Sequence, residues 1–366
     1  MTCNAWTELN VDTLRANLGQ VKASLSPRAE TILVVKSNAY GHGVRPVATC
    51  ARAAGVRWFV VSRMDEAVEL RGALADARIL VLGAMWPSDV DAALEQGITP
   101  ILMGEDQARA LADGARQRHL ALPCHVKIDT GMGRLGLPWE QAAGILVRLK
   151  AQGGLDIQGL CTHFASAGKP GDPFAALQGQ RFGSVVTACK AQGLSIPFQH
   201  VANSAAFSAR PEWDLDGVRV GILAYGYAGR LSAPRVRTRP FLQWKTRVIH
   251  VKRVPAGFPV SYLSTFVTAT PTQLATIDVG YSDGFSRLMS NKGYVLIGGR
   301  RCRVVGRVTM NFTIVDVGPD AAVREGDEAV LIGQQGDETL WADELARWCQ
   351  TIPYEILTNI RSTPRT

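Results

Sequence analysis

The sequence predicts an α/β fold, a (β/α)8 TIM barrel followed by a mainly-β C-terminal domain. Two observations lead to this prediction. Over the first two thirds of the 366 residues, short β-rich segments alternate with amphipathic, alanine-rich segments, as in a parallel sheet covered by helices. Beyond about residue 235, segments rich in valine and isoleucine follow one another with little helix between them. We therefore expect a barrel domain over residues 1–235 and a β-rich domain over residues 236–366.

The barrel prediction depends on the number of candidate strands, because eight parallel strands close this fold. They lie at 31–36, 57–62, 78–83, 98–103, 123–129, 157–164, 199–204 and 217–221. Helix-like segments lie between them, for example at 46–55, 65–74 and 139–153. A first helix over 11–25 would lead into the first strand.

The β-rich domain is predicted from strand-like segments at 244–254, 273–280, 294–310 and 328–333. Glycine and proline punctuate these segments, which is typical of a sandwich or barrel. One helix is expected at 342–350. The alternating segment 6–11 resembles a strand, so residues 1–10 could pair with this domain and tie the two termini together.

Charge, apolar runs and cysteine content indicate which partners and which cellular compartment to expect. Lys and Arg (40) exceed Asp and Glu (32) by eight, but the positive charges are scattered, so we expect no nucleic-acid partner. The surplus favours small anions such as phosphates and carboxylates. The longest apolar runs, such as 79–86, are too short to span a bilayer, and the start shows no signal peptide. Seven cysteines, an odd number without a CxxC pattern, argue against a disulfide framework and favour the reducing cytoplasm. No set of His, Cys, Asp and Glu residues has metal-ligand spacing, so we expect no metal.

Reactive side chains stand at the ends of the predicted barrel strands, where barrel enzymes carry their chemistry. The set consists of Lys36, Arg134, His163, Ser204 and Arg219, together with the backbone amides of Gly221 and Ile222. A hydroxyl and free amides after the last two strands are suited to a phosphate group. A lysine at the buried end of a strand is unusual unless its charge is neutralised. A lysine linked covalently to pyridoxal phosphate, with an arginine nearby, would explain both features.

The chain resembles the bacterial alanine racemases, a family of fold type III pyridoxal phosphate enzymes, over nearly its whole length. The first shared motif is KSNAYGHG at 36–43. Further motifs follow in the order of the family, namely KIDTGMGRLG (127–136), THFA (162–165), ANSAA (202–206), VRVGILAYGY (218–227), VSY (260–262), GYSDGF (280–285), GRVTMN (306–311) and TIPYEILTNI (351–360). So many motifs in order make the resemblance very specific.

The resemblance implies the function and the role of each site residue. Lys36 would carry the cofactor and be one of two bases, and Tyr262 from a partner subunit would be the other. The phosphate would be held by Tyr40, Ser204, Gly221, Ile222 and Tyr354. Arg219 would face the pyridine nitrogen and His163 would bond to Arg219. The implied reaction interconverts L- and D-alanine in a homodimer with shared active sites and supplies D-alanine for peptidoglycan.

Arg134 would bond the phenolic oxygen of the cofactor and, with the backbone N–H of Met310, assist the substrate carboxylate. Lys127 matches a lysine that is carbamylated in many members and there positions the arginine; the alternative is that Lys127 pairs with an acid. Asn311 replaces the usual aspartate, which alters the charge at the entrance and bears on substrate range. His119, His125, His200 and His250 are interpreted as structural or surface residues.

Other functions remain open on the sequence alone. One is a racemase of serine or of a broader range of amino acids. Another is a fold type III amino-acid decarboxylase, although such enzymes typically place an acidic residue at the pyridine nitrogen, unlike Arg219. A third is a non-enzymatic carrier of the cofactor built on the same barrel, which would lack a domain such as 236–366.

Overall fold

The computed structural model describes residues 5–169, 171–228 and 234–364, and these form two compact units. One unit consists of residues 14–39 and 44–239. The other consists of the described residues of 1–13, 40–43 and 240–366. Residues 40–43, the YGHG half of the KSNAYGHG motif, thus cluster with the C-terminal residues, which the sequence pattern did not indicate.

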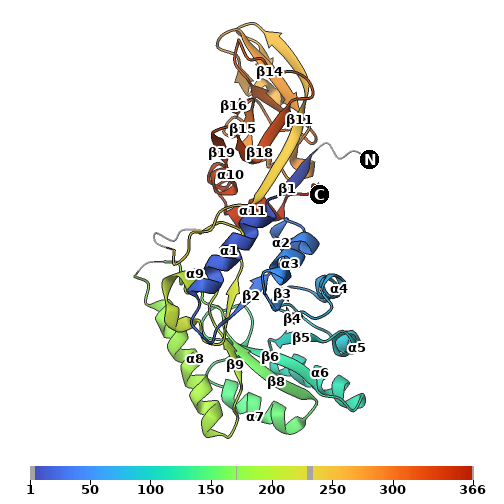
Figure 1. Cartoon of the computed structure of the whole chain (residues 1–366), viewed down its shortest axis with the longest axis vertical. Helices are drawn as coiled ribbons and strands as arrows, with labels where there is room; N and C mark the ends of the chain where they lie inside the picture. The colour runs from blue at the N-terminus through green and yellow to red at the C-terminus, as the bar shows by residue number, and fades with distance from the viewer. Residues whose placement is uncertain (1–4, 170, 229–233, 365–366) are drawn as a thin grey trace. The chain divides into compact units, whose positions relative to one another are not determined.

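The first unit is a closed barrel of eight parallel strands surrounded by helices (Figure 1). The strands are β2 (Glu30–Val34), β3 (Trp58–Val61), β4 (Arg78–Val81), β5 (Ile98–Leu102), β6 (Leu122–Asp129), β8 (Leu155–Cys161), β9 (Phe198–His200) and β10 (Gly217–Val220). They are hydrogen-bonded in the order β10-β2-β3-β4-β5-β6-β8-β9, and a parallel bridge between Asn203 and Arg219 joins the last strand to the first. The predicted TIM barrel is confirmed, with each strand at its predicted place.

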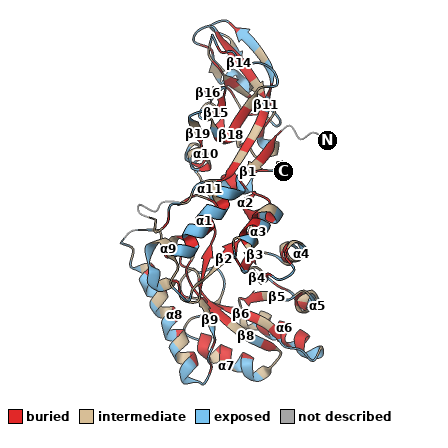
Figure 2. Cartoon of the chain, viewed as in Figure 1, coloured by how far each residue is buried: buried red, intermediate tan, exposed pale blue. Residues whose placement is uncertain are grey.

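Helices surround the barrel because their apolar residues recur on one face. In α6 (Glu105–Gln117) the buried residues Ala108, Leu111, Ala112 and Ala115 have the spacing of one helical stripe. The strands carry buried residues on both faces (Figure 2), as expected for a parallel sheet under helices. The other helices of this part are α1 (Val11–Ser24), α3 (Val44–Ala53), α4 (Met64–Ala73), α5 (Val90–Glu95), α7 (Ala142–Gln152), α8 (Phe174–Ala191) and α9 (Ser204–Ala209).

The second unit is an antiparallel β-barrel. Its ring runs through β11 (Leu242–Val254), β14 (Thr272–Ile277), β17 (Thr313–Asp316), β16 (Arg300–Val304), β15 (Tyr294–Ile297) and β18 (Glu328–Gln335), and β18 pairs again with β11. The predicted β-rich segment 294–310 contains a hairpin, because Gly298 and Gly299 adopt positive φ angles of 59° and 71° between β15 and β16. Two helices, α10 (Ala342–Cys349) and α11 (Pro353–Thr358), lie near the end of the chain.

Both ends of the described chain belong to this sheet. β1 (Trp6–Leu9) pairs antiparallel with β11 and parallel with β20 (Thr363–Pro364). Shorter strands complete the unit, namely β12 (Pro259–Val260), β13 (Phe266–Val267) and β19 (Glu338–Leu340). Among the residues described in both units, none of the helices has the length and apolar character that crossing a membrane requires.

Candidate active site

The carboxyl ends of the barrel strands bring the predicted cationic residues together. Lys36 follows β2, Lys127 lies on β6, and Arg219 lies on β10. Arg134 is in the loop after β6, and His163 stands two residues after the end of β8. Burial and the charges of Arg219, Lys127, Arg134 and Lys36 together lower the pKa of His163 to about 3. The five predicted residues therefore form one cluster within the barrel unit, and His163 is neutral in it.

Lys36 lies at the start of an unusual turn rather than at the end of a strand. β2 ends at Val34, and the four residues after Lys36 have φ angles between 52° and 54°, so they form a left-handed turn. None of these residues is glycine, and the left-handed conformation costs about 1–2 kcal/mol for each. The side chain of Asn38 accepts a hydrogen bond from the amide of Val44 at 2.8 Å, which fastens one end of the turn.

The amine of Lys36 is placed to be deprotonated. Burial lowers its pKa from the ordinary value, Arg134 lowers it further, and Glu66 acts in the opposite direction. The pKa of Lys127 is also lowered, chiefly by burial, and this side chain is only 7% exposed. In the described residues Lys127 has no ion pair with an acid, so the pairing considered from the sequence is not found there.

Arg219 is buried, and both of its terminal nitrogens donate hydrogen bonds within the chain. One terminal nitrogen donates to the backbone oxygen of His200 at 2.6 Å and lies 2.8 Å from its Nδ1. The other donates to the backbone oxygens of Thr162 at 2.6 Å and Val201 at 3.0 Å and lies 3.5 Å from Nδ1 of His163. Its Nε–H has no acceptor within the described part of the chain, so it is the donor left for a ligand.

Ser204 and the turn after β10 form a group of small donors. The hydroxyl oxygen of Ser204 accepts hydrogen bonds from the amides of Gly221 at 3.0 Å and Leu223 at 3.4 Å. The amide of Ile222, between them, has no acceptor among the described residues. A hydroxyl and backbone amides converging in this way are suited to the oxygens of a phosphate group. With Arg219 Nε and the amine of Lys36 in the same barrel, the residues present fit pyridoxal phosphate.

Four predicted site residues belong to the second unit. The rings of Tyr40 and Tyr354 are 5.8 Å apart, and burial raises the pKa of both hydroxyls. Tyr262 is 71% exposed and stands between Ser261 and Leu263, which both have φ angles of 62°.

The fourth, Met310, is 55% exposed. Its carbonyl oxygen accepts hydrogen bonds from the amide of Ser282 at 3.0 Å and from its hydroxyl at 2.8 Å. Its own N–H has no acceptor in the described chain, which suits a carboxylate ligand. The neighbouring Asn311 donates to the hydroxyl of Ser282 at 3.1 Å, so an amide here is part of the same local network.

The sequence interpretation missed His200. The sequence interprets it as a structural or surface residue; it is fully buried, as a structural residue would be, and it also contacts Arg219 directly. A signal was present in the predicted strand 199–204, because His200, Ala202 and Ser204 alternate there and would share one face; in the structure β9 ends at His200 and Ser204 begins α9. His125 is also fully buried and lies beside His200.

Comparisons with known proteins agree over the whole length. The family model described as "Alanine racemase, N-terminal domain" matches residues 9–229, and "Alanine racemase, C-terminal domain" matches residues 241–366. An alanine racemase of Carboxydothermus hydrogenoformans is 43% identical over 357 residues, which cover 97% of this chain and 96% of the relative.

Two solved structures show the same agreement in fold. Alanine racemase from a D-cycloserine-producing Streptomyces lavendulae superposes with a TM-score of 0.93 at 34% identity and covers 100% of this chain and 97% of its own. An alanine racemase from Bartonella henselae with covalently bound pyridoxal phosphate has a TM-score of 0.89 at 27% identity, with 99% of each chain covered.

Proposed function

The chain belongs to the alanine racemase family and interconverts L- and D-alanine with pyridoxal phosphate, and we propose that Lys36 and Tyr262 are its two bases. Racemisation removes a proton from one face of Cα and delivers another to the opposite face, so two groups are needed. The observation that supports Lys36 is its lowered pKa at the carboxyl end of the barrel. A neutral amine can both bind the cofactor aldehyde and accept a proton.

Pyridoxal phosphate, when bound, supplies the electron withdrawal that makes the Cα proton removable. Arg219 would hold the pyridine nitrogen through its Nε–H. Because arginine keeps its proton, this donor leaves the ring nitrogen largely unprotonated. His163, kept neutral by burial and its cationic neighbours, would bond to Arg219 without adding charge.

The phosphate would be held by the hydroxyl of Ser204 and by the amides of Ile222 and Gly221, of which the Gly221 amide would exchange its hydrogen bond to Ser204 for one to the phosphate. The hydroxyls of Tyr40 and Tyr354 are the further phosphate ligands in this proposal. Burial raises the pKa of both tyrosines, so each remains a neutral O–H donor, which a phosphate oxygen can use. Arg134 and the N–H of Met310 would bind the substrate carboxylate, and Arg134 would also bond the phenolic oxygen of the cofactor.

We propose that Lys127 is carbamylated. The reaction joins CO2 to the neutral amine and releases one proton, leaving a carboxylate on the side chain. Lys127 is buried, its pKa is lowered, and Arg134 and Arg219 are near enough to influence it. A carbamate would replace this repulsion by attraction and position Arg134. Carbon-13 bicarbonate should give a carbamate signal that disappears in Lys127→Ala; its absence in the wild-type protein would contradict the proposal.

The second base is proposed to act in a homodimer. Tyr262, Leu263, Met310 and Phe312 are exposed by 71%, 82%, 55% and 46%, which is unusual for large apolar residues. Their segments adjoin, because the hydroxyl of Ser261 donates to the backbone oxygen of Arg307 at 2.8 Å. A second copy of this chain would cover the patch, and Tyr262 would enter the active site of that copy.

Mixing two inactive variants tests both bases and the shared site. Lys36→Ala and Tyr262→Ala should each lose ~10²–10⁴-fold in activity, the usual contribution of a positioned proton-transfer group. Random exchange of subunits makes half of the dimers mixed, and each mixed dimer has one complete site of two. Activity should therefore recover to about a quarter of the wild-type value. Subunit exchange shown by mass without recovered activity would refute the shared site.

The proposed location is the cytoplasm, where D-alanine would be made for peptidoglycan precursors. Cys124, Cys161, Cys189, Cys302 and Cys349 are buried and form no disulfide within the described part of the chain, as expected in a reducing compartment. Recovery of the protein with periplasmic or secreted markers on cell fractionation would contradict this location.

A further inference from the structure

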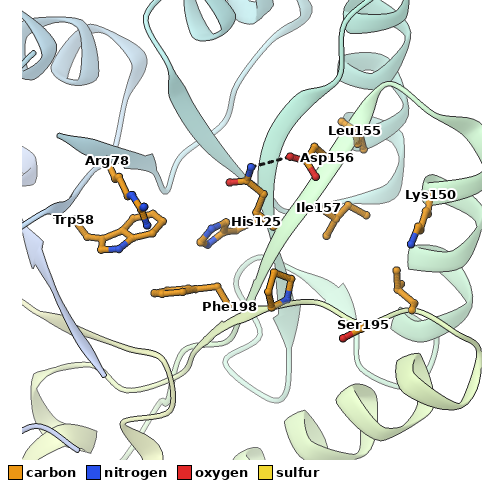
Figure 3. A pocket seen from close by; sticks show the side chains of 12 residues that line it. Trp58, Arg78, His125, Lys150, Leu155, Asp156, Ile157, Ser195 and Phe198 are labelled. Carbon is orange, nitrogen blue, oxygen red and sulfur yellow. Dashed lines mark hydrogen bonds between the residues drawn. The ribbon is translucent and has the colours of Figure 1, made fainter. Parts of the chain in front are cut away.

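A pocket of the barrel unit is lined by twelve residues, which Figure 3 shows from close by. Its volume is about 580 Å³. Trp58, Arg78 and Phe198, which line it, are the first residues of β3, β4 and β9. The pocket is therefore at the N-terminal mouth of the barrel, whereas Lys36 and Ser204 follow the carboxyl ends of their strands. None of the proposed active-site residues lines it.

His125 connects this pocket to the cationic cluster. Its Nδ1 lies 2.9 Å from Nε2 of His200, and Nδ1 of His200 lies 2.8 Å from a terminal nitrogen of Arg219. Since arginine can only donate, Nδ1 of His200 accepts and its proton is on Nε2. That Nε2–H donates to Nδ1 of His125, whose own proton is then on Nε2. The network thus assigns one tautomer to each ring.

Two of the residues that line the pocket each have a buried ring N–H without an acceptor in the part of the chain that is described. These groups are Nε2–H of His125 and Nε1–H of Trp58. His125 is fully buried and lines the pocket, and its Nε2 is the ring nitrogen that His200 does not use. A buried donor without an acceptor is unfavourable, so two at one cavity favour a ligand with hydrogen-bond acceptors.

The chain makes specific room for His125. A Cβ atom at Gly159 would lie 2.6 Å from the ring of His125, closer than side chains pack. Gly159 is the register partner of His125 in the pairing of β6 with β8. The absence of a side chain there fixes the imidazole in its place between the pocket and His200.

The walls of the pocket are flat and its rim is cationic. The rings of Trp58 and Phe198 are stacked, with centroids 4.9 Å apart. The guanidinium of Arg78 lies 5.0 Å over the ring of Trp58, and Lys150 is on the rim. The one carboxylate of the lining, Asp156, already accepts a hydrogen bond from Gln158 at 2.7 Å, as drawn in Figure 3.

We propose that this pocket binds a small planar carboxylate, whose oxygens accept hydrogen bonds from His125 and Trp58. A carboxylate can accept from both ring N–H groups, and its charge is opposite to that of Arg78 and Lys150. Hydrogen bonds to a charged acceptor are also about twice as strong as neutral ones. The planar body lies along the aromatic walls. The negative charge polarises His125 and then His200, which strengthens the hydrogen bond of His200 to Arg219. This second effect rests on the proposed role of Arg219 at the cofactor, whereas binding does not.

Benzoate is the probe and benzamide its neutral control. Calorimetry with the holoenzyme should detect binding of benzoate, and binding of benzamide should be much weaker. Trp58→Phe and His125→Phe keep an aromatic ring but lose one donor, and each should weaken benzoate binding about tenfold. Arg78→Gln, at an exposed position, should weaken it severalfold. Arg134→Ala should leave it unchanged, which separates this pocket from the proposed substrate carboxylate site.

The coupling is read from the visible absorption of the bound cofactor. Benzoate should shift that absorption in the wild-type enzyme and in Arg134→Ala but not in His200→Asn, which breaks the chain and leaves the pocket lining unchanged. Equal binding by wild type, Trp58→Phe and Arg78→Gln would overturn the site. Binding with no spectral shift in the wild type would overturn the coupling. Neither result depends on whether Lys36 and Tyr262 are the bases, which the subunit-mixing experiment decides separately.

Discussion

The carboxylate of Glu66 accepts a hydrogen bond from the amide of Ser37 at 2.6 Å, across 29 residues of sequence. Its other oxygen accepts from the amides of Ser62 at 2.8 Å and Arg63 at 3.2 Å. Glu66 therefore joins the start of α4 to the left-handed turn that follows Lys36. This contact offsets part of the conformational strain of a turn built without glycine.

We expect Glu66→Ala to loosen the turn and to lower both stability and cofactor binding. Loss of hydrogen bonds to a charged acceptor should cost about 1.5–3 kcal/mol. Removing the negative charge also removes the influence that raises the pKa of Lys36, so this pKa should fall further. Urea unfolding of the apoprotein and the pH dependence of pyridoxal phosphate binding measure the two effects.

Glu66→Gln is the matched control for that variant. It keeps one acceptor oxygen for Ser37 but removes the charge, so most of the stability should return while the pH profile stays shifted. If both variants bind the cofactor with the wild-type pH profile, Glu66 has no electrostatic effect on Lys36.

Replacement of Arg219 by glutamate should increase transamination relative to racemisation. A carboxylate at this position would favour a protonated pyridine nitrogen, which arginine does not. The substitution also leaves the backbone oxygens of Thr162 and Val201 without their donor, so we expect destabilisation of about 1–3 kcal/mol for each unsatisfied oxygen. The ratio of pyruvate to D-alanine formed, measured on folded enzyme, reports the chemistry.

Arg219→Lys separates the charge of Arg219 from its shape. It retains a positive donor, so transamination should not rise, although the lost contacts should slow racemisation. An equal rise in both variants would attribute the effect to distortion of the site rather than to the proton on the ring nitrogen.

Acid should destabilise the apoprotein before most carboxylates titrate. The pKa of His125 is lowered to about 4 and that of His163 to about 3, by burial first and then by Arg219, and the pKa of His200 falls in the same direction. In the unfolded chain each would titrate near about 6.5. Between these values the unfolded state binds more protons, so stability present above about pH 6.5 is lost as the pH falls.

The expected slope is about 1.4 kcal/mol per pH unit for each buried histidine. Urea unfolding between about pH 6.5 and about pH 4.5 measures it. His125→Gln, whose amide can still accept a hydrogen bond from His200, should reduce the slope by the contribution of one titrating histidine. A slope that is the same in this variant would show that His125 does not remain neutral in the folded protein.

The sequence predicted the barrel well because each strand is a short buried run between helical stripes. It did not predict the shape of the Lys36 turn. Asn38 favours the left-handed conformation as a single residue, but Ser37 and Ala39 do not. The contact that holds Ser37 comes from Glu66, far away in the sequence. A local pattern cannot contain that contact.

Polar and charged site residues at the ends of barrel strands could be predicted from the sequence. Residues that contact the site only through another side chain were harder to predict. Arg219 and Ser204 were found from the barrel rule and the motifs. His125 and His200 were not, because a buried histidine has the same local pattern whether it packs or bonds to an arginine. Only the pairing of β6 with β8 and of β8 with β9 brings the two rings together.

Gly41→Ala should disrupt the second half of the KSNAYGHG motif. Gly41 has a φ angle of 76°, and a Cβ atom there would lie 2.2 Å from the backbone oxygen of Leu357 in α11. Backbone must therefore move, so the cost should exceed the gain of about 0.4–1 kcal/mol that a compatible glycine-to-alanine change brings. We expect a loss of stability of roughly 2–3 kcal/mol and weaker cofactor binding. Gly19→Ala is the matched control, because it lies within α1 with nothing within 4 Å and should stabilise by about 0.5–1 kcal/mol. Thermal unfolding of both apoproteins compares them, and equal shifts would mean that the turn does not need the contact between Gly41 and Leu357.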